Sequence, residues 1–202
     1  MTPETNWCVI TGGPSSGKTT TVNILRERGY VTTIEHARHY IDTQRVTGKS
    51  VEEIRANQIV FQRGILDMQI AEEEALDPEA QVFLDRALPD ALAYYRFLGL
   101  TPDVEYLSLI GPGRYRAVFV LDLLPLAADY ARTEDRPAQV EIHRLLTDVY
   151  TELGYRPLAV PALPPVERVD FILAALNGVP RKGQLEAQPE STGPAVVRPR
   201  PL

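Results

Sequence analysis

The chain has 202 residues, of which 44% are hydrophobic and 24% are charged, and its formal net charge is −6. This length suits one domain with a substantial core, and the acidic balance argues against general nucleic-acid or acidic-membrane binding. No apolar run is long enough to span a bilayer, and the first residues lack the regions of a signal peptide, so we expect a cytoplasmic protein with no membrane partner. The sequence does not predict the oligomeric state.

Apolar and helical segments alternate along the chain, which favours an α/β domain with a parallel sheet. The candidate strands are Trp7–Thr11, Tyr30–Ile34, Gln81–Asp85, Ala117–Leu121 and Pro157–Val160. Helices are expected over Thr20–Arg28, Val51–Leu76, around Tyr94 and Tyr95, from Thr101-Pro102 onward, over Pro137–Leu153 and over Val166–Leu176.

The start of the long helix and the end of the domain have their own signals. Ser50 and Glu53 form the pattern of a capping box at the start of the helix over Val51–Leu76. From Pro180 onward the chain is rich in proline and small polar residues without an apolar period. We therefore predict a folded domain over residues 1–178 and a disordered tail over 179–202.

A phosphate-binding motif follows the first strand. Gly12, Gly17, Lys18 and Thr19 match G-x-x-x-x-G-K-[ST], the P-loop, at the point where a strand passes into a helix. Glycines let backbone N–H groups surround phosphate oxygens, the lysine reaches the β- and γ-phosphates, and the threonine hydroxyl suits Mg²⁺. The predicted ATP-binding residues are Gly12, Gly13, Pro14, Ser15, Ser16, Gly17, Lys18, Thr19 and Thr20.

The third strand ends in a second candidate element of the nucleotide site. Asp85 comes at the end of an apolar run and is followed by Arg86. A carboxylate there can hold Mg²⁺ directly or through water, and an adjacent arginine suits a phosphate or a small substrate. Metal binding at Thr19 and Asp85 is thus one interpretation, and capping of the following turn by Asp85 is the other.

Glu35 and Arg38 follow the second strand, at the edge of the sheet where open α/β domains bind ligands. A carboxylate in this position can accept the proton of a substrate hydroxyl during phosphoryl transfer. A surface i,i+3 ion pair between the two residues is the alternative, and the sequence does not decide between them. The neighbouring histidines, His36 and His39, have no ligand set that indicates a metal site.

Arg132 and Arg136 flank a polar loop after the fourth strand. Phosphoryl transfer benefits from positive charge that closes over the transferring group, so this loop is a candidate arginine lid. A solvated charged loop is the other interpretation.

Several stretches together resemble a small ATP-binding family of P-loop kinase-like domains, AAA_28, a group with the NadR-like nicotinamide riboside kinase domains. They are VITGGPSSGKTT, EHARHYI, VFLDRALPDALAYYRFLG, YRAVFVLD and HRLLTDVYTELGYRPLAVP, and the likeness covers about residues 6–176. The resemblance implies a three-layer P-loop fold with a five-stranded parallel sheet in the order 2-3-1-4-5. It also implies ATP and Mg²⁺ at the strand ends, and an acceptor pocket near the second and third strands.

The lid departs from the riboside kinases. Their Asp-Asp-Gly-x-Arg pattern is replaced here by Ala-Arg-Thr-Glu-Asp-Arg, so the resemblance does not specify the acceptor. The family-like layout sets the long helix beside the acceptor pocket, where Arg55, Gln58, Gln62 and Gln69 share one face. With Arg38, the first three of these are the candidate substrate residues, although a polar helix face is more often solvated surface.

These features predict a kinase that transfers the γ-phosphoryl group of ATP to a nucleoside, nucleotide or similar hydroxylated small molecule. The predicted catalytic residues are Lys18, Glu35, Asp85, Arg86, Arg132 and Arg136. A nucleoside triphosphate hydrolase and a non-catalytic, nucleotide-dependent binding module are the alternatives.

Overall fold

The computed structural model describes residues 4–125 and 135–180. The strands in these ranges are β1 (Cys8–Thr11), β2 (Val31–Thr32), β3 (Val82–Asp85), β4 (Ala117–Leu121) and β5 (Leu158–Val160). The helices there are α1 (Lys18–Glu27), α2 (His36–Val46), α3 (Val51–Ala56), α4 (Gln58–Ala75), α5 (Leu88–Phe97), α6 (Val104–Leu109), α7 (Arg136–Glu152) and α8 (Pro165–Asn177). None of these helices has the length and apolar character needed to cross a bilayer.

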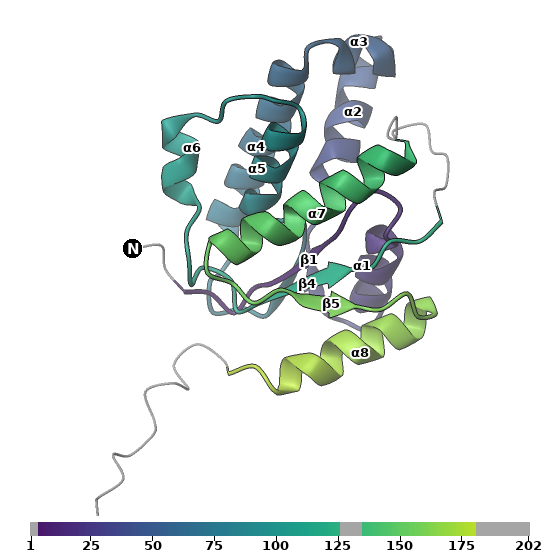
Figure 1. The fold of residues 1–202 in the computed structure, drawn as a ribbon, viewed down its shortest axis with the longest axis vertical. Helices are drawn as coiled ribbons and strands as arrows, with labels where there is room; N and C mark the ends of the chain where they lie inside the picture. Colours follow the sequence, from purple (N-terminus) through teal and green to yellow (C-terminus); the bar gives the residue numbers. More distant parts are fainter. Residues whose placement is uncertain (1–3, 126–134, 181–202) are drawn as a thin grey trace, which may run out of the picture.

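The five strands form one parallel sheet in the order β2-β3-β1-β4-β5, as predicted (Figure 1). β1 is central, with Ile10 in register with Asp85 on one side and Thr11 in register with Val120 on the other. Parallel strands end at a common edge of the sheet, so the segments that follow β1, β2, β3 and β4 meet there. That edge is where the predicted nucleotide site lies.

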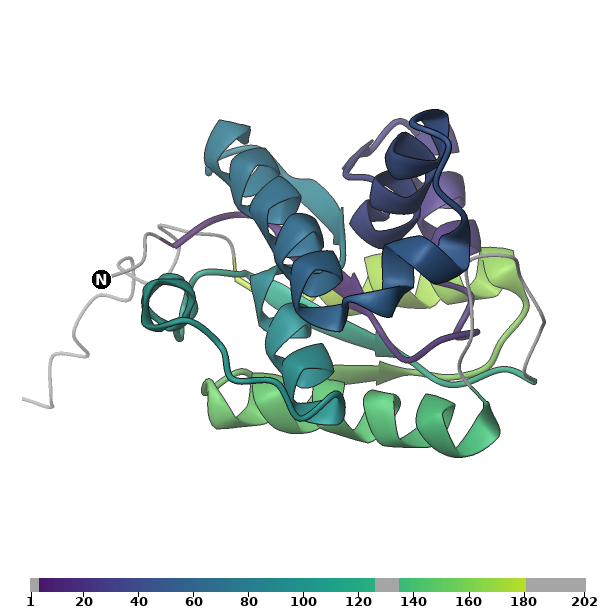
Figure 2. The same cartoon turned by 90° about the horizontal axis from the view of Figure 1, so that it is seen from above.

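Helices cover both faces of the sheet, which is why the strands β1, β3 and β4 are largely apolar and buried. Side chains alternate between the faces of a strand. Cys8 and Ile10 accordingly pack with residues of α1 and α8, whereas Val9 belongs to the cluster that includes Tyr150 of α7. Viewed from above in Figure 2, the strands lie between α7 and α8. The result is the predicted three-layer arrangement.

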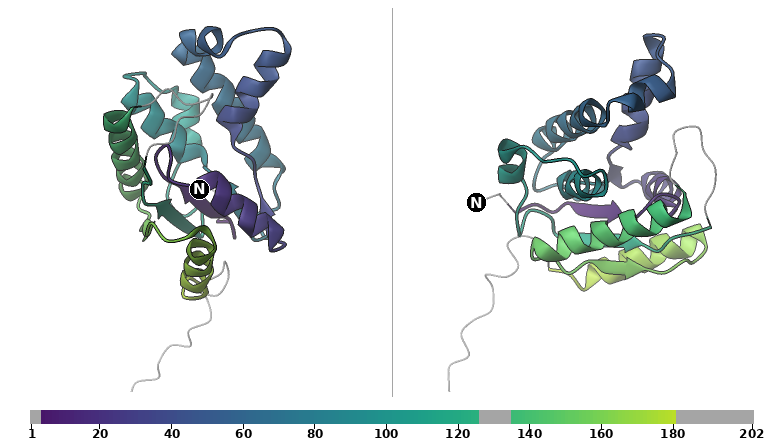
Figure 3. Two further views of the ribbon diagram at one scale, coloured as in Figure 1. Left: turned by 90° about the vertical axis from the view of Figure 1, so that its right-hand side faces the viewer. Right: turned by 45° about the horizontal axis from the view of Figure 1, so that its top comes forward.

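The helices α2, α3 and α4 extend beyond the sheet, as the blue helices of Figure 3 show. Their contact has a small core of its own, made by Ile41, Ile54 and Phe61. Because this group of helices follows β2 and precedes β3, it lies beside the edge at which those two strands end. It forms the outer wall of the candidate site.

The prediction of a single helix over Val51–Leu76 is wrong, because the chain breaks between α3 and α4 at Asn57. The backbone of Asn57 is extended, with φ −106° and ψ 92°, and its side chain accepts a hydrogen bond from the Val60 N–H group. Asparagine competes in this way with the helical backbone and begins a new helix. The capping box of Ser50 and Glu53 at the start of α3 is confirmed.

Two further boundaries differ from the predictions, and that of the tail is not tested. The helix expected from Thr101-Pro102 begins at Val104, since Asp103 has an extended backbone and bonds through its carboxylate to Arg63 of α4. The edge strand β2 has only two residues, and Val31 is more than half exposed. The predicted tail, residues 179–202, lies outside the described residues from position 181 onward.

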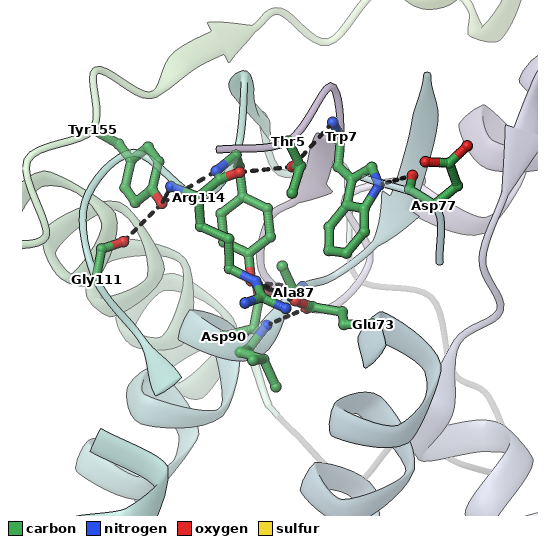
Figure 4. A network of polar contacts seen from close by, with 11 residues as sticks. Thr5, Trp7, Glu73, Asp77, Ala87, Asp90, Gly111, Arg114 and Tyr155 are labelled. Carbon is green, nitrogen blue, oxygen red and sulfur yellow. Dashed lines mark hydrogen bonds and ion pairs between the residues drawn. The ribbon is translucent and has the colours of Figure 1, made fainter. Parts of the chain in front are cut away.

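A buried polar network connects the end of α4 with the start of α5 (Figure 4). The Glu73 carboxylate accepts a hydrogen bond from the Leu88 N–H group at 3.0 Å, and from the guanidinium Nε of Arg114 at 2.9 Å. The hydroxyl group of Tyr115 donates to the same carboxylate. Glu73 therefore fixes the N-terminus of α5, the helix that follows Asp85.

Candidate functional site

The P-loop motif forms a tight turn between β1 and α1 that requires glycine at two positions. Gly12 has φ 140°, and a Cβ atom there would lie 2.7 Å from the Leu121 carbonyl oxygen. Gly17, the N-cap residue of α1, has φ 82°. Helix α1 begins at Lys18, so its N-terminal N–H groups adjoin the loop, an arrangement that favours phosphate.

Lys18 is buried within the loop. Its ammonium group donates hydrogen bonds to the carbonyl oxygens of Gly12 and Gly13, at 2.7 and 3.0 Å, and to the Ser16 hydroxyl oxygen. Burial, together with the nearby charge of Arg86, lowers the pKa of Lys18 to about 7. A phosphate group beside this ammonium would favour its protonated form.

The carbonyl groups of the loop are held from outside by two other segments. The Gln139 side chain, from α7, donates to the Pro14 carbonyl oxygen at 2.7 Å, and the Leu124 N–H group donates to that of Ser15. The Gly13 N–H group donates weakly to His143 Nδ1 at 3.4 Å. The carbonyl oxygens of the loop are thus held by segments that lie far from it in the sequence.

Arg168 of α8 is the third support of the loop. Its side chain is 2% exposed, and it donates hydrogen bonds to the carbonyl oxygens of Ser16, Asp122 and Pro161. These three oxygens belong to the P-loop and to the segments that follow β4 and β5. One guanidinium group therefore connects three segments at the same edge of the sheet.

The two threonines of the motif lie on the first turn of α1 and are exposed. The Thr19 hydroxyl group lies 3.4 Å from a carboxylate oxygen of Glu35. The P-loop and the end of β2 are thereby close enough to share a metal ion or a substrate. Thr20 is one residue further along the helix and has no such contact with a described residue.

Asp85 ends β3 beside the P-loop strand and is 2% exposed. Its backbone N–H group donates to the Thr33 hydroxyl oxygen, while its side-chain Oδ1 has no hydrogen-bond donor among the described residues. Burial and the nearby carboxylate of Glu35 raise the pKa of Asp85 to about 6. A buried carboxylate oxygen without a donor fits a cation or its water ligand.

The turn after β3 is capped by Asp90, not by Asp85. The Asp90 carboxylate accepts hydrogen bonds from the Ala87 N–H group and from the hydroxyl groups of Thr11 and Tyr150. The capping interpretation of Asp85 is therefore wrong. Asp90 was not among the predicted site residues, although it lies in the first turn of the helix that follows Asp85 and Arg86.

Arg86 adopts a left-handed backbone conformation, with φ 71°, at the start of this turn. Its guanidinium group lies 3.2 Å from Asp90 Oδ1 and donates to the Tyr94 hydroxyl group at 3.1 Å. A non-glycine residue with positive φ is uncommon and is often found at functional sites. Arg86 also lines the cavity that adjoins Lys18.

Glu35 and Arg38 do form an ion pair, with 3.5 Å between Arg38 Nε and Glu35 Oε2. The pair is not on an open surface, because both side chains are largely buried and line the same cavity. Glu35 is the N-cap residue of α2, shortly after the end of β2. Its carboxylate lies beside the hydroxyl group of Thr19. The proposed base therefore lies at the predicted edge of the sheet.

The two arginines of the predicted lid have different outcomes. Arg132 lies outside the described residues. Arg136 is the first residue of α7 and is exposed, and its guanidinium group donates to the Gln139 side-chain oxygen at 3.0 Å. Arg136 thus contacts the residue that holds Pro14, and it does not itself line the cavity.

Gln139 and Arg168 were missed by reasoning from the sequence, although a signal was present. Arg168 is spaced four residues from Ile172, which places it on the buried face of α8. Gln139 lies three residues before Ile142, and both are on the buried face of α7. Polar residues in the apolar stripe of a helix indicate a buried partner, here the backbone of the P-loop.

A cavity of about 380 Å³ extends from the P-loop to the helices α2, α3 and α4. Lys18, Glu35 and Arg86 lie on its wall together with all four candidate substrate residues, Arg38, Arg55, Gln58 and Gln62. The polar helix face does not form this part of the wall alone, since Phe61 and Ile65 line the cavity too. Arg55, on α3 before the break at Asn57, lines the cavity as well.

The residues present fit a magnesium ion that shares its coordination with phosphate and water. Among the residues that the structure describes, no three His, Cys, Asp or Glu side chains come together as a metal site. Mg²⁺ is commonly held by one or two protein oxygens together with substrate phosphates. Thr19 Oγ1 and Asp85 Oδ1 are the oxygens that this structure offers.

Several solved structures share this fold. NadR protein in complex with NAD and AMP-PNP is 18% identical, with a TM-score of 0.58 over 86% of this chain and 50% of the NadR chain. Deoxyadenosine kinase from M. mycoides is 14% identical, with a TM-score of 0.58 over 86% of this chain and 100% of the kinase. Thymidylate kinase from Ehrlichia chaffeensis is 13% identical, with a TM-score of 0.56 over 86% of this chain and 100% of that kinase.

At these identities the comparisons show a common fold, a nucleoside-kinase-like P-loop fold, and the chain spans half the length of the NadR chain. No curated protein matches the sequence. A protein-family model described as an AAA domain, AAA_28, matches residues 7–168, a range that includes the P-loop, Asp85 and Arg168. A P-loop of this kind implies nucleotide binding. The chain belongs to the AAA_28 family of AAA domains.

Proposed function

We propose that the protein is an ATP- and Mg²⁺-dependent kinase that transfers the γ-phosphoryl group to a hydroxyl group of a small molecule. The observation that carries this proposal is the single cavity that joins the P-loop lysine to a second wall of polar and aromatic side chains. A nucleotide alone would occupy the loop. The remaining space, lined by α2, α3 and α4, suits an acceptor.

The groups around the junction suit in-line transfer. Lys18 stabilises negative charge on the β- and γ-phosphates, and Arg86 adds a second cation from the end of the neighbouring strand β3. Glu35 accepts the proton of the attacking hydroxyl group, since its carboxylate lies at the boundary between the loop and the acceptor space. Arg38 holds that carboxylate in place through the ion pair.

Thr19 and Asp85 would hold Mg²⁺, which when bound neutralises charge on the phosphates. Arg132 and Arg136 are proposed to contribute positive charge from the lid segment, Arg136 through its place at the start of α7. The domain is proposed to end near residue 178.

The test is a screen with ATP labelled on the γ-phosphate, Mg²⁺ and a panel of nucleosides, nucleotides, sugars and vitamin precursors. Label on an acceptor, lost when EDTA removes Mg²⁺, is the expected result. Label released only as free phosphate would indicate a hydrolase. Tight ATP binding without turnover would indicate a nucleotide-dependent binding module.

A further inference from the structure

Arg168 of α8 is a buried cation whose hydrogen-bond partners are all uncharged. Its guanidinium group donates to the main-chain carbonyl oxygens of Ser16, Asp122 and Pro161. Within residues 4–125 and 135–180, no carboxylate forms an ion pair with it, since the bond to Asp122 is made to the backbone of that residue. An arginine side chain stays protonated in proteins, so Arg168 keeps a net positive charge in the interior.

This charge lies against the turn that leads into α1. A Cβ atom at Gly17 would lie 3.2 Å from a terminal nitrogen of Arg168. Gly17 is also the N-cap residue of α1, next to the N-terminal N–H groups that favour phosphate. Burial lowers the pKa of Arg168 below its ordinary value, which reflects the cost of holding a charge at this place.

The bond from Arg168 to Ser16 sets the direction of one N–H group of the P-loop. The Ser16 carbonyl and the Gly17 N–H belong to a single peptide group, and the described residues contain no cis peptide bond. In a trans peptide group the C=O and N–H bonds point in opposite directions. Arg168 therefore holds the Gly17 N–H group facing away from itself. A donor on the carbonyl oxygen also polarises the peptide group and strengthens that N–H group as a donor.

A bound triphosphate would supply the counter-charge that Arg168 lacks. A buried charge without an ionic partner is costly, and an anion a few ångströms away lowers that cost. Protein between two charges weakens their attraction less than water does. Lys18 is the cation of the loop itself, and Arg168 is a second cation that acts from behind the Ser16–Gly17 peptide group.

We propose that Arg168 is a positioning residue for the triphosphate, which it orders through the Ser16–Gly17 peptide group and attracts by its charge without touching the nucleotide. This inference rests on the ATP-binding step of the proposed function and not on transfer, because no acceptor takes part in that step. The contribution of Arg168 to nucleotide affinity should therefore grow with the negative charge of the phosphates.

The test is calorimetry on the full-length protein with Mg²⁺ and three ligands: a non-hydrolysable ATP analogue, ADP and AMP. Arg168→Met removes the charge and the hydrogen bonds but keeps an unbranched side chain. We expect the affinity for the ATP analogue to fall by at least about tenfold, the scale of a charge that acts across several ångströms of protein. The loss should be smaller for ADP and smallest for AMP. Arg168→Lys keeps the charge and should recover part of the loss.

Arg116→Met is the matched control, since Arg116 makes the same kind of contact at the other end of α8. Its guanidinium group donates to the carbonyl oxygens of Leu176, Val179 and Pro180. Arg116 directly precedes β4, so it lies at the edge of the sheet opposite the P-loop. The melting temperature should fall in both Met variants, but the affinity for the ATP analogue should fall only in Arg168→Met.

Three outcomes would overturn the inference and leave the kinase proposal standing. They are an unchanged affinity for the ATP analogue in Arg168→Met, an equal loss for the ATP analogue and AMP, and an equal loss in Arg116→Met. If Arg168→Met does not fold, Arg168→Gln, which keeps a donor but no charge, gives the same comparison. Binding of the ATP analogue that depends on Arg168, without transfer to any compound of the acceptor panel, would overturn the kinase proposal and support this inference.

Discussion

The guanidinium group of Arg86 and the carboxylate of Asp90 lie 3.2 Å apart at the start of α5, and the carboxylate is almost fully buried. Asp90 also accepts hydrogen bonds from the hydroxyl groups of Thr11 and Tyr150. One carboxylate thus connects the strand before the P-loop, the turn after β3 and helix α7. The position of Arg86 in the cavity depends on this connection.

Asp90→Asn is expected to lower the free energy of unfolding by about 3 kcal/mol, since it removes one partner of a buried ion pair that is also hydrogen-bonded. Asp67→Asn is the matched control, because Asp67 pairs with Arg63 in an exposed i,i+4 contact. Such surface pairs contribute less than about 1 kcal/mol. Urea unfolding of the two variants gives both values, and equal losses would contradict the central role of Asp90.

Lys18→Ala should leave the fold intact and abolish most ATP binding. The ammonium group is buried against the carbonyl groups of its own loop, and its lowered pKa reflects the cost of that burial. Its removal therefore costs little stability, while the phosphates lose their cation. Calorimetry with a non-hydrolysable ATP analogue measures the change, and Lys49→Ala, at an exposed lysine before α3, is the control. Unchanged ATP affinity in Lys18→Ala would refute the nucleotide site.

Local sequence patterns were sufficient to predict the phosphate-binding loop and the carboxylate beside it. Gly12, Gly17, Lys18 and Thr19 lie within one short stretch of the chain, and Asp85 ends a strand whose apolar run is visible in the sequence. The resemblance to a known family then supplied the sheet order, which the structure confirms.

The rest of the site depends on contacts between distant residues. Arg168 bonds to Ser16 across 152 positions, and Gln139 bonds to Pro14 across 125. No periodicity identifies such partners, although burial of each polar side chain is predictable from its helix face. The break at Asn57 was missed for another reason: the apolar period continues through it, and only the side-chain bond to Val60 starts a new helix.

Glu73 is expected to make stability depend on pH. Burial raises the pKa of this carboxyl group above its ordinary value, in spite of the adjacent Arg114. The folded state therefore holds the proton more tightly than the unfolded state, so this contribution to stability is present at low pH and is lost as pH rises through the raised pKa. Glu73→Gln cannot lose a proton and should lack this decline.

Urea unfolding from pH 4 upward checks this expectation by the difference between the wild type and Glu73→Gln. That difference should change in favour of the variant as pH rises above the ordinary carboxyl pKa of about 4.3. Glu74→Gln, at the exposed neighbouring position, should follow the wild type at every pH. A pH-independent difference for Glu73→Gln would mean that Arg114 and the Leu88 N–H group fully offset the burial.

Glu35→Gln separates transfer to an acceptor from hydrolysis of ATP. The variant keeps the size of the side chain and its contact with Thr19, but it cannot take a proton, so transfer should fall by roughly 10²–10⁴-fold. ATP affinity should hardly change, because the phosphates are bound by the P-loop. Background hydrolysis depends on Lys18 and Asp85 and should fall much less than transfer.

Both rates of Glu35→Gln are to be measured on one preparation, with labelled ATP in the presence and absence of the acceptor. Arg38→Gln is the companion variant: it removes the ion pair but leaves the carboxylate, so it should retain more transfer activity than Glu35→Gln. Equal loss of transfer and hydrolysis in Glu35→Gln would indicate a structural or metal-linked carboxylate. No loss of either would reduce the pair to a structural contact of the cavity wall, since a base that is not needed for transfer cannot be the group that accepts the proton.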